Sequence, residues 1–351
     1  MSTVDFATRM NKKLGSQVVV PASELVTARL YTSGSFAFDA ALGGGYPANH
    51  FVEVIGPSSA GKTFTTFKCI AANQRLDPDF SALWVAGEHF DKDQAEALGV
   101  DLNRVTLVRT QVMEHALETM IDGIECQEFD NVTLDSYPAL VPSDEAEKGM
   151  DEFVVASGAK VLNKFIRKVG PASARAIDGS DRPFFGIFIN QWRDQIGGFS
   201  RFGTPKITPG GKGKDYFFYI REELSRDGDF ISEKRPGQGE VKVGQTIKLK
   251  TIKNKSAAPQ QIATVDAYFA DAPSMGFKRG DYDVAKEYTD IGMSLGLITR
   301  AGAYYRYAGQ QWMGKEGLTS ALRSDSLLQE ALRRDVLSTA TAMESLDSME
   351  A

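Results

Sequence analysis

Apolar positions in the middle of the chain alternate between short continuous runs and runs with helical spacing. The continuous runs are typical of strands buried on both faces, and they are FVEVIG, SALWVAG, RVTLVRT, NVTLDS and FFGIFINQ. Between them, apolar residues recur at helical spacing at about 62–76, 91–98, 111–127 and 152–169. This alternation predicts an α/β fold with a mainly parallel, twisted sheet and helices on both of its faces.

The two ends of the chain follow other patterns. Near the N-terminus, DFATRMNKKLG suits a small amphipathic helix and SQVVVPA suits a short strand. Residues from about 216 to 269 favour strands with no strong helix between them. The segment DYDVAKEYTDIGMSLGLITRAGAYYRYAGQQWM then predicts a helix and a small hairpin in a separate C-terminal unit. The final DVLSTATAMESLDSMEA carries acidic residues without Lys or Arg, which predicts a frayed helix or a disordered tail.

Composition narrows the classes of function only moderately. The 351 residues are 42% hydrophobic and 25% charged, which suits two or three globular domains. Because the net charge is −6, a nucleic-acid site would have to be a local basic patch. The two cysteines and three histidines show no metal-ligand spacing. With no apolar leader and no run long enough to span a bilayer, we expect a cytoplasmic protein without a membrane partner.

The stretch VEVIGPSSAGKTFTT contains the pattern G-x-x-x-x-G-K-[ST] between a strand and a helix, which is the context of a phosphate-binding loop. Its two glycines permit backbone angles that point consecutive N–H groups at phosphate oxygens. Lys62 is expected to reach the β- and γ-phosphates, and the Thr63 hydroxyl to bind Mg²⁺. The predicted nucleoside triphosphate site consists of Gly56, Pro57, Ser58, Ser59, Ala60, Gly61, Lys62 and Thr63.

Three other strands end in polar residues at the same predicted sheet edge. Asp135 is placed to bind Mg²⁺ through water, and Glu88 to polarise the water that attacks the γ-phosphate. Asn190 and Gln191 end a third strand, where an amide can sense whether the γ-phosphate is present. Each of these residues could instead be an ordinary polar strand end, and the phosphate loop upstream favours the functional interpretation.

Basic and aromatic residues are interleaved in WRDQIGGFSRFGTPKITPGGKGK, directly after Gln191. A loop of this length is either functional or disordered, and its composition suits single-stranded nucleic acid, because cations follow the phosphates and rings stack. A flexible surface loop is the alternative. The candidate DNA-binding residues here are Arg193, Phe199, Arg201, Phe202, Lys206, Gly210 and Gly211.

Two further groups of basic residues are candidates for contact with phosphate groups. On the helix expected at 152–169, Lys160, Lys164, Arg167 and Lys168 could supply charge to the same site. In KLKTIKNKSAAP, the lysines that include Lys253 and Lys255 form either a solvated strand face or part of a subunit contact that reaches a neighbour's phosphate.

These motifs, in this order, resemble those of RecA-type recombinases. The similarity extends from 31–45 to 297–310, through GPSSAGKT, GEHF, LGVDLNRV, VTLDSYPALVP, FINQWRDQIG, TPGGKG and IKNKSAAP. The chain resembles a divergent member, such as a phage-encoded one. The resemblance implies a RecA-like ATPase core with DNA-binding loops at 31–270. It also implies an N-terminal oligomerisation arm at 1–30, a small α+β domain at 271–335 and an acidic, disordered tail at 336–351.

The resemblance also implies roles for single positions. Glu88 matches the water-activating carboxylate, Asp135 the Mg²⁺-associated acid, and Gln191 the switch between γ-phosphate and DNA, with Lys62 completing the catalytic set. The first DNA loop would lie at 149–155 and the second at 193–211. The matched DNA-contacting residues are Lys160 and Arg167, and the matched lysines acting across the subunit interface are Lys253 and Lys255.

Some positions depart from the family pattern. A tyrosine that stacks on adenine is replaced near Gln94, with Asp91 as the adenine contact. The interface lysine of the family aligns with Asp215, so Lys214 or Lys212 would have to substitute for it.

The function implied is ATP- and Mg²⁺-dependent homologous recombination, performed by a homo-oligomeric helical filament on single-stranded DNA that pairs with homologous duplex DNA. A single-strand-binding or mediator protein would be a further partner, in the host cytoplasm if the chain is phage-encoded. Two alternatives stay open. One is a helicase or loader of the same fold, and the other is a DNA-coating scaffold that uses ATP only as a switch.

Overall fold

The computed structural model describes the chain except residues 1–2, 16–18, 25–28, 148–156, 175–181, 195–205 and 351. An eight-stranded mixed sheet forms its centre, in the order β12-β11-β10-β3-β7-β6-β4-β5. From β10 to β5 all neighbours are parallel, and β11 pairs antiparallel with both β10 and β12. The strands are β3 His50–Ile55, β4 Ala82–Ala86, β5 Val105–Arg109, β6 Asn131–Asp135, β7 Phe185–Asn190, β10 Ile220–Arg235, β11 Gly239–Asn254 and β12 Ile262–Tyr268.

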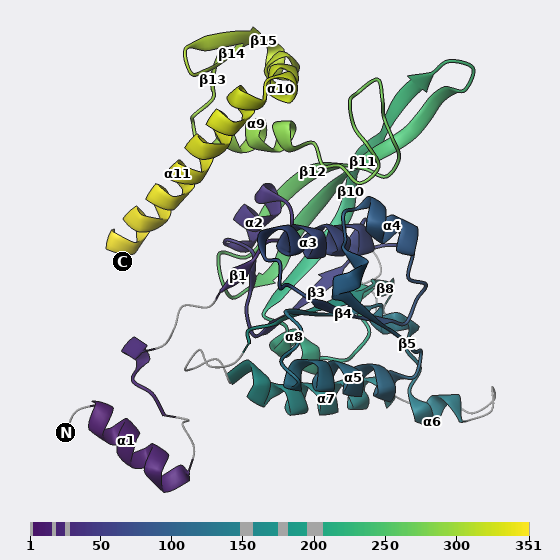
Figure 1. Cartoon of the computed structure of the whole chain (residues 1–351), viewed down its shortest axis with the longest axis vertical. Helices are drawn as coiled ribbons and strands as arrows, with labels where there is room; N and C mark the ends of the chain where they lie inside the picture. Colours follow the sequence, from purple (N-terminus) through teal and green to yellow (C-terminus); the bar gives the residue numbers. More distant parts are fainter. Residues whose placement is uncertain are drawn as a thin grey trace, which may run out of the picture.

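Helices cover both faces of the sheet, as the alternating pattern predicts (Figure 1). One face carries α2 Phe36–Leu42, α3 Lys62–Leu76 and α4 Lys92–Ala97, and the other α5 Met113–Glu125, α7 Ser157–Ala174 and α8 Gly213–Phe217. Adjacent residues of a strand enter different cores: Ile187 packs with Trp84 on the first face, while Phe188 packs with Phe165 on the second. The sheet is therefore buried on both sides, which explains its continuous apolar strands.

The C-terminal unit has a hydrophobic core of its own, which includes Leu318 and Leu332. It consists of α9 Val284–Ser294, the antiparallel strands β13 Thr299–Ala301, β14 Tyr304–Tyr307 and β15 Gln310–Met313, then α10 Gly314–Ser324 and α11 Ser326–Glu350. Where a hairpin was predicted, three strands form. The residues predicted as a frayed helix or disordered tail continue α11 to Glu350.

Two other predictions of secondary structure need correction. The run at β5 was expected to be buried on both faces, but β5 is the edge strand and Leu107 is exposed. In SQVVVPA the described residues form no strand, and its last residue begins a short 3₁₀ helix, Ala22–Glu24.

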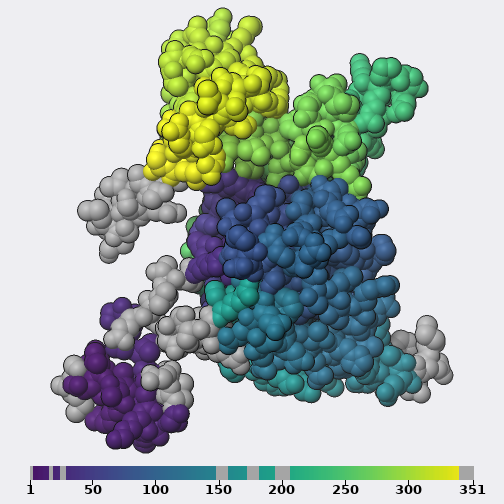
Figure 2. All heavy atoms as spheres, in the orientation of Figure 1, coloured from purple at the N-terminus to yellow at the C-terminus, as the bar shows by residue number. Residues whose placement is uncertain are grey.

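The remaining elements are short, and the N-terminal helix stands beside the core as a separate body (Figure 2). They are α1 Thr3–Leu14, β1 Leu30–Tyr31, β2 Tyr46–Pro47, the 3₁₀ helices Leu102–Arg104 and Tyr137–Ala139, α6 Ser143–Ala146, β8 Arg193–Asp194 and β9 Lys206–Ile207. Helix α1 is amphipathic and leaves Val4, Phe6 and Leu14 exposed. Of the helices in the described part of the chain, none is long and apolar enough to cross a bilayer.

Candidate nucleotide and DNA site

The phosphate-binding loop connects β3 to α3 at the carboxyl edge of the parallel strands. A Cβ on Gly56 would lie 2.4 Å from the carbonyl oxygen of Leu224, so only glycine fits against β10. Gly61 begins α3 with a φ of 94°, and no side chain of the described residues caps this helix end. The first N–H groups of α3 are therefore open to an anion, and the helix dipole adds to their attraction.

Lys62 is folded back over this loop. Its Nζ donates hydrogen bonds to the carbonyl oxygens of Gly56 at 3.1 Å and Pro57 at 2.7 Å. Burial lowers the pKa of Lys62, while the carboxylates of Asp135 and Glu88 oppose that shift. The ammonium thus lies among the loop carbonyls and close to two acids, where phosphate oxygens would replace the carbonyls as partners.

Thr63 and Asp135 form the part of the site that fits Mg²⁺. The Thr63 hydroxyl donates to Asp135 Oδ2 at 2.9 Å, so two hard oxygen ligands are adjacent. Burial raises the pKa of Asp135 to about 6, and the hydrogen bond from Thr63 opposes the shift. Among the described residues, no group of three or more His, Cys, Asp or Glu side chains could hold a metal ion by itself. Mg²⁺ in nucleotide sites commonly takes its other ligands from phosphates and water.

Glu88 is held beside this pair by the backbone. The N–H groups of Gly87 and Glu88 donate to the carbonyl oxygen of Asp135 at 2.8 and 3.1 Å, which fixes the end of β4 against the end of β6. The Ser136 hydroxyl donates to Glu88 Oε1. The carboxylate is thereby oriented at the sheet edge, where a water molecule could be polarised.

A cavity of about 520 Å³ joins these side chains. The predicted residues that line it are Ser58, Ser59, Gly61, Lys62, Thr63, Glu88, Asp135 and Gln191. A larger cavity of about 740 Å³ adjoins it at Glu88 and is lined by residues such as His89 and Arg109, but it contains no phosphate loop. The smaller cavity is therefore the candidate nucleotide site.

Sequence reasoning missed the wall of this cavity that faces the phosphate loop. The wall comes from the antiparallel strands, with Phe230, Gln245, Ile247, Ala267 and Phe269. Phe230 lies next to an irregularity in the β10–β11 pairing, and its ring is 6.1 Å from that of Phe269. These residues are far apart in the sequence, so only the pairing of β10, β11 and β12 brings them together.

Asp91 does not line the cavity, contrary to the prediction that it contacts adenine. Its carboxylate accepts the backbone N–H of Gln94 at 2.9 Å and caps α4. An aspartate in front of a helix is a favoured cap, which accounts for its position. Gln94 itself lines the cavity.

The lysines predicted at the subunit interface also lie outside this cavity. Lys253 Nζ donates to the carbonyl oxygens of Asp215, Tyr216 and Phe218 at 2.7, 3.2 and 2.6 Å, at the end of α8. Lys255 is exposed, with Nζ 5.6 Å from the centre of the Tyr219 ring.

Lys214, one of the two lysines that could substitute for an interface lysine, points into the protein in this structure, and its role at an interface stays a prediction. Its side chain is 2% exposed and its Nζ lies 3.0 Å from Glu53 Oε1, inside the protein. A buried carboxylate attracts the cation inward. Lys212, the other candidate, is exposed.

The predicted DNA-binding residues on α7 face outward. Leu162, Phe165 and Val169 are buried against the sheet, so Lys160 and Arg167 lie on the opposite, exposed side. The amphipathic pattern of the helix dictates this arrangement.

The second predicted DNA loop is described only at its two ends. There β8 pairs antiparallel with β9, and Arg193 and Lys206 are both exposed. Phe199, Arg201, Phe202 and the predicted first loop at 149–155 lie outside the described residues.

The structure shows why glycine occupies positions 210 and 211, and sequence reasoning missed this explanation. They lie against α7, and a Cβ on Gly210 would be 2.8 Å from Leu162 Cδ2. A Cβ on Gly211 would be 3.2 Å from the Cβ of Ala159. Close packing between the end of the loop and the helix therefore accounts for both glycines.

Comparisons with known proteins cover nearly the whole chain. Residues 4–274 match the family described as the RecA N-terminal domain. The chain is 32% identical to Protein RecA of Chlorobaculum parvum over 321 residues, which span 91% of this chain and 86% of that protein. It is 31% identical to Protein RecA of Staphylococcus aureus strain JH9 over 330 residues, which span 93% of this chain and 88% of that protein.

Proposed function

This chain belongs to the RecA family, and from that premise we propose that it is an ATP-dependent DNA recombinase. In this proposal the protein polymerises as a helical filament on single-stranded DNA and pairs that strand with homologous duplex DNA. The observation that supports it most is the single cavity lined by Lys62, Glu88, Asp135 and Gln191. The candidate hydrolytic residues and Gln191, which lies two residues before the predicted second DNA loop, thus line one cavity.

Different described residues would bind the phosphates of ATP, bind Mg²⁺ and activate the attacking water. The first turn of α3 and Lys62 would hold the phosphates, and Thr63 and Asp135 would hold Mg²⁺. When bound, Mg²⁺ would neutralise phosphate charge during the transfer. Glu88 would accept a proton from the attacking water, held in position by Ser136 and by the backbone of Asp135.

Gln191 would report the state of the nucleotide to the DNA. It follows β7 directly, lines the cavity, and precedes β8, which carries Arg193. Contact with the γ-phosphate would fix this connection, and hydrolysis would release it. The exposed cations of α7 and of the β8–β9 ribbon would then contact DNA phosphates.

Filament growth would use a contact between unlike surfaces of successive subunits. Helix α1 exposes apolar residues and stands beside its own core, which suits packing against a neighbour (Figure 2). A contact of this type does not close on itself unless the rotation forms a ring, and otherwise produces a helix. A single-strand-binding or mediator protein would assist loading.

One observation favours a second candidate, a DNA-coating scaffold in which ATP serves only as a switch. Lys214 points inward, so Asp215 remains at the position of the family's interface lysine. An acid at that position would repel a neighbour's phosphates and slow hydrolysis.

The test is the rate of ATP hydrolysis with single-stranded DNA, with duplex DNA and without DNA. We expect strong stimulation by single strands and little by duplex. Glu88→Gln should retain ATP binding but lower turnover by about 10²–10⁴-fold, the usual contribution of a general base. Lys62→Ala should weaken ATP binding itself.

The outcomes separate the candidates. Unchanged turnover in Glu88→Gln would contradict the assignment of the base. ATP-dependent DNA binding without DNA-stimulated hydrolysis would favour the scaffold. Closed rings in place of filaments under the electron microscope would favour a helicase or loader.

A further inference from the structure

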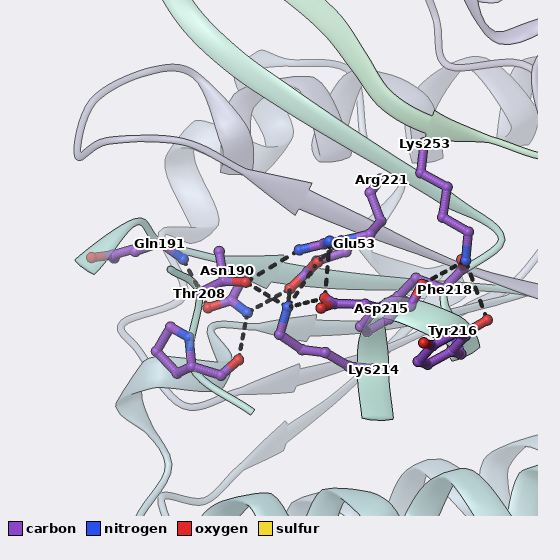
Figure 3. A network of polar contacts seen from close by, with 11 residues as sticks. Glu53, Asn190, Gln191, Thr208, Lys214, Asp215, Tyr216, Phe218, Arg221 and Lys253 are labelled. Atoms are coloured by element: carbon purple, nitrogen blue, oxygen red, sulfur yellow. Dashed lines mark hydrogen bonds and ion pairs between the residues drawn. The ribbon is translucent and has the colours of Figure 1, made fainter. Parts of the chain in front are cut away.

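Two cations and two carboxylates gather on the face of the sheet that α8 covers (Figure 3). Glu53 of β3 is fully buried, just upstream of the phosphate loop. Lys214 Nζ lies 3.0 Å from Glu53 Oε1, and Arg221 Nε of β10 lies 2.6 Å from Oε2. Asp215 Oδ1 completes the cluster, 2.9 Å from Arg221 Nη1. Buried charges are costly unless paired, so these four side chains are held in one geometry.

Glu53 also fixes the start of the connection that leaves β7. Asn190 Nδ2 donates to Glu53 Oε1 at 2.7 Å, and Asn190 Oδ1 accepts the backbone N–H of Gln191 at 2.9 Å. The side chain of Gln191 lines the nucleotide cavity. A displacement of Gln191 is therefore transmitted through Asn190 to the buried carboxylate.

The same cluster holds the other end of that connection. The Thr208 hydroxyl accepts hydrogen bonds from Lys214 Nζ at 2.5 Å and from Arg221 Nη2 at 3.3 Å. The carbonyl oxygen of Pro209 accepts a second hydrogen bond from Asn190 Nδ2 at 3.2 Å. The charged cluster thus joins both ends of the segment between β7 and α8 (Figure 3).

Helix α8 is tied to the cluster at one end and capped at the other. Lys214 and Asp215 belong to α8, and Lys253 donates to the carbonyl oxygens where the helix ends. Between them, the Tyr216 side chain is 83% exposed. The backbone that carries Tyr216 is therefore anchored on one side by Lys214 and Asp215 and on the other by Lys253.

We propose that Lys214 is a positioning residue that couples the nucleotide cavity to the DNA-binding segment, acting through Glu53 and Asn190. The proposal rests on the proposed function. Lys214 does not line the cavity. If Lys214 loses its charge, Arg221 is the one cation of the cluster that remains for both Glu53 and Asp215. The Glu53 carboxylate is then drawn toward Arg221. Asn190 then loses its fixed acceptor, and Thr208 loses its shortest contact.

The test measures linkage between two ligands. The affinity for a labelled oligothymidine is determined with and without the slowly hydrolysed analogue ATPγS, and the ratio of the two constants is the coupling. Lys214→Met keeps an unbranched side chain that is one atom shorter and removes its charge. We expect the coupling to fall by about ten-fold or more, while ATPγS affinity without DNA stays within about three-fold of the native value.

Two further variants separate coupling from folding. Lys214→Arg restores a cation and should recover most of the coupling. Thr208→Val removes one hydroxyl without stranding a charge, so it should fold normally and lower the coupling by a smaller factor, about three-fold. Melting temperatures of all variants serve as the measure of folding.

Native coupling in both Lys214→Met and Thr208→Val overturns the inference. A parallel loss of nucleotide affinity, DNA affinity and melting temperature in both variants also overturns it, because a purely structural role predicts that pattern. If the native protein shows no effect of ATPγS on DNA affinity, the proposed function fails instead. That result differs from the failure of the further inference, in which ATPγS does affect the DNA affinity of the native protein and the variants keep the same coupling.

Discussion

Arg221 and Glu222 are neighbours on β10, and their side chains enter opposite faces of the central sheet. On the Arg221 face, the buried Glu53 carboxylate contacts two cations. On the Glu222 face, the carboxylate accepts a hydrogen bond from the Tyr46 hydroxyl at 2.9 Å, and its Oε2 has no partner among the described residues. Burial raises the pKa of Glu222 to about 8, and the Tyr46 hydrogen bond opposes the shift.

Two more acids lie at α2: Asp39 of that helix, which is half-buried, and Glu287 of α9, which is buried and accepts hydrogen bonds from the Ser35 hydroxyl and the backbone N–H of Phe36. Burial raises the pKa of Asp39 to about 6 and that of Glu287 to about 7, although hydroxyl and backbone N–H donors oppose both shifts. Within the described part of the chain, neither forms an ion pair. The protein therefore tolerates buried carboxylates in two ways. Cations pair with Glu53 and fix its geometry, whereas burial without a cation raises the pKa of Asp39, Glu222 and Glu287 and makes their charge sensitive to pH.

Removing Glu53 should have the largest effect on stability. Glu53→Leu leaves Lys214 and Arg221 buried with only the partly exposed Asp215, and we expect a loss of about 3–5 kcal/mol in the free energy of unfolding. Denaturant unfolding with intrinsic tryptophan fluorescence measures it.

The matched substitution is Glu222→Leu, which strands a tyrosine hydroxyl but no cation. We expect a smaller loss at pH 7, because the substitution also removes the free-energy cost of keeping the Glu222 carboxyl protonated, which offsets the loss of about 1–3 kcal/mol from the stranded hydroxyl. Equal losses in the two variants would contradict the difference between the two faces.

The second effect is the pH dependence that Glu222 confers. Its folded pKa is about 8, above the ordinary pKa of 4.5 for an accessible glutamate. Below that lower value both states are protonated and the group has no effect. As pH rises toward 8, only the unfolded state releases the proton, so stability falls by up to about 1.4 kcal/mol per pH unit. Above the folded pKa the loss is complete.

Glu222→Gln should remove this contribution between pH 5 and 8. The free energy of unfolding of the native protein should then fall more steeply with pH than that of the variant, and Asp39, Asp135 and Glu287 contribute to the slope that remains. Glu240→Gln, an exposed acid on the β10–β11 hairpin, is the control and should keep the native slope. Identical slopes for native protein and Glu222→Gln would show that Glu222 is not protonated by burial.

A comparison of the nucleotide site with the charged cluster around Glu53 shows which features the sequence could predict. Lys62, Thr63, Glu88 and Asp135 follow strands of a parallel sheet, and the carboxyl ends of such strands meet at one edge. Local pattern and sheet topology therefore sufficed to bring them together. The mainly parallel sheet and both helix layers followed from the same alternation, whereas the order of the strands did not.

No local pattern in the sequence predicted the charged cluster of Glu53, Lys214, Asp215 and Arg221. Lys214 lies in a Gly- and Lys-rich stretch that is typical of an exposed loop, and its inward direction depends on a partner 161 residues away. A usable signal was nevertheless present in FVEVIG. A lone acid in a strand buried on both faces needs a cation or a proton, because isolated buried charges are costly. Glu53 satisfied that need with Lys214 and Arg221.

The smallest effect concerns the hydroxyl of Tyr46. Tyr46→Phe removes the donor to Glu222 Oε1 and should cost about 1 kcal/mol. Because that hydrogen bond favours the ionised carboxylate, its loss should raise the pKa of Glu222 further and extend the decline in stability above pH 8.

A double-mutant cycle with Glu222→Gln isolates this contribution. If the hydroxyl acts on the carboxylate, the two substitutions should be non-additive by at least about 0.5 kcal/mol, and the non-additivity should grow from pH 6 to pH 9. A coupling that is independent of pH would mean that Tyr46 contributes only packing and an ordinary hydrogen bond. The Glu222 face would then owe its pH dependence to burial alone, whereas the Glu53 face owes its geometry to charge.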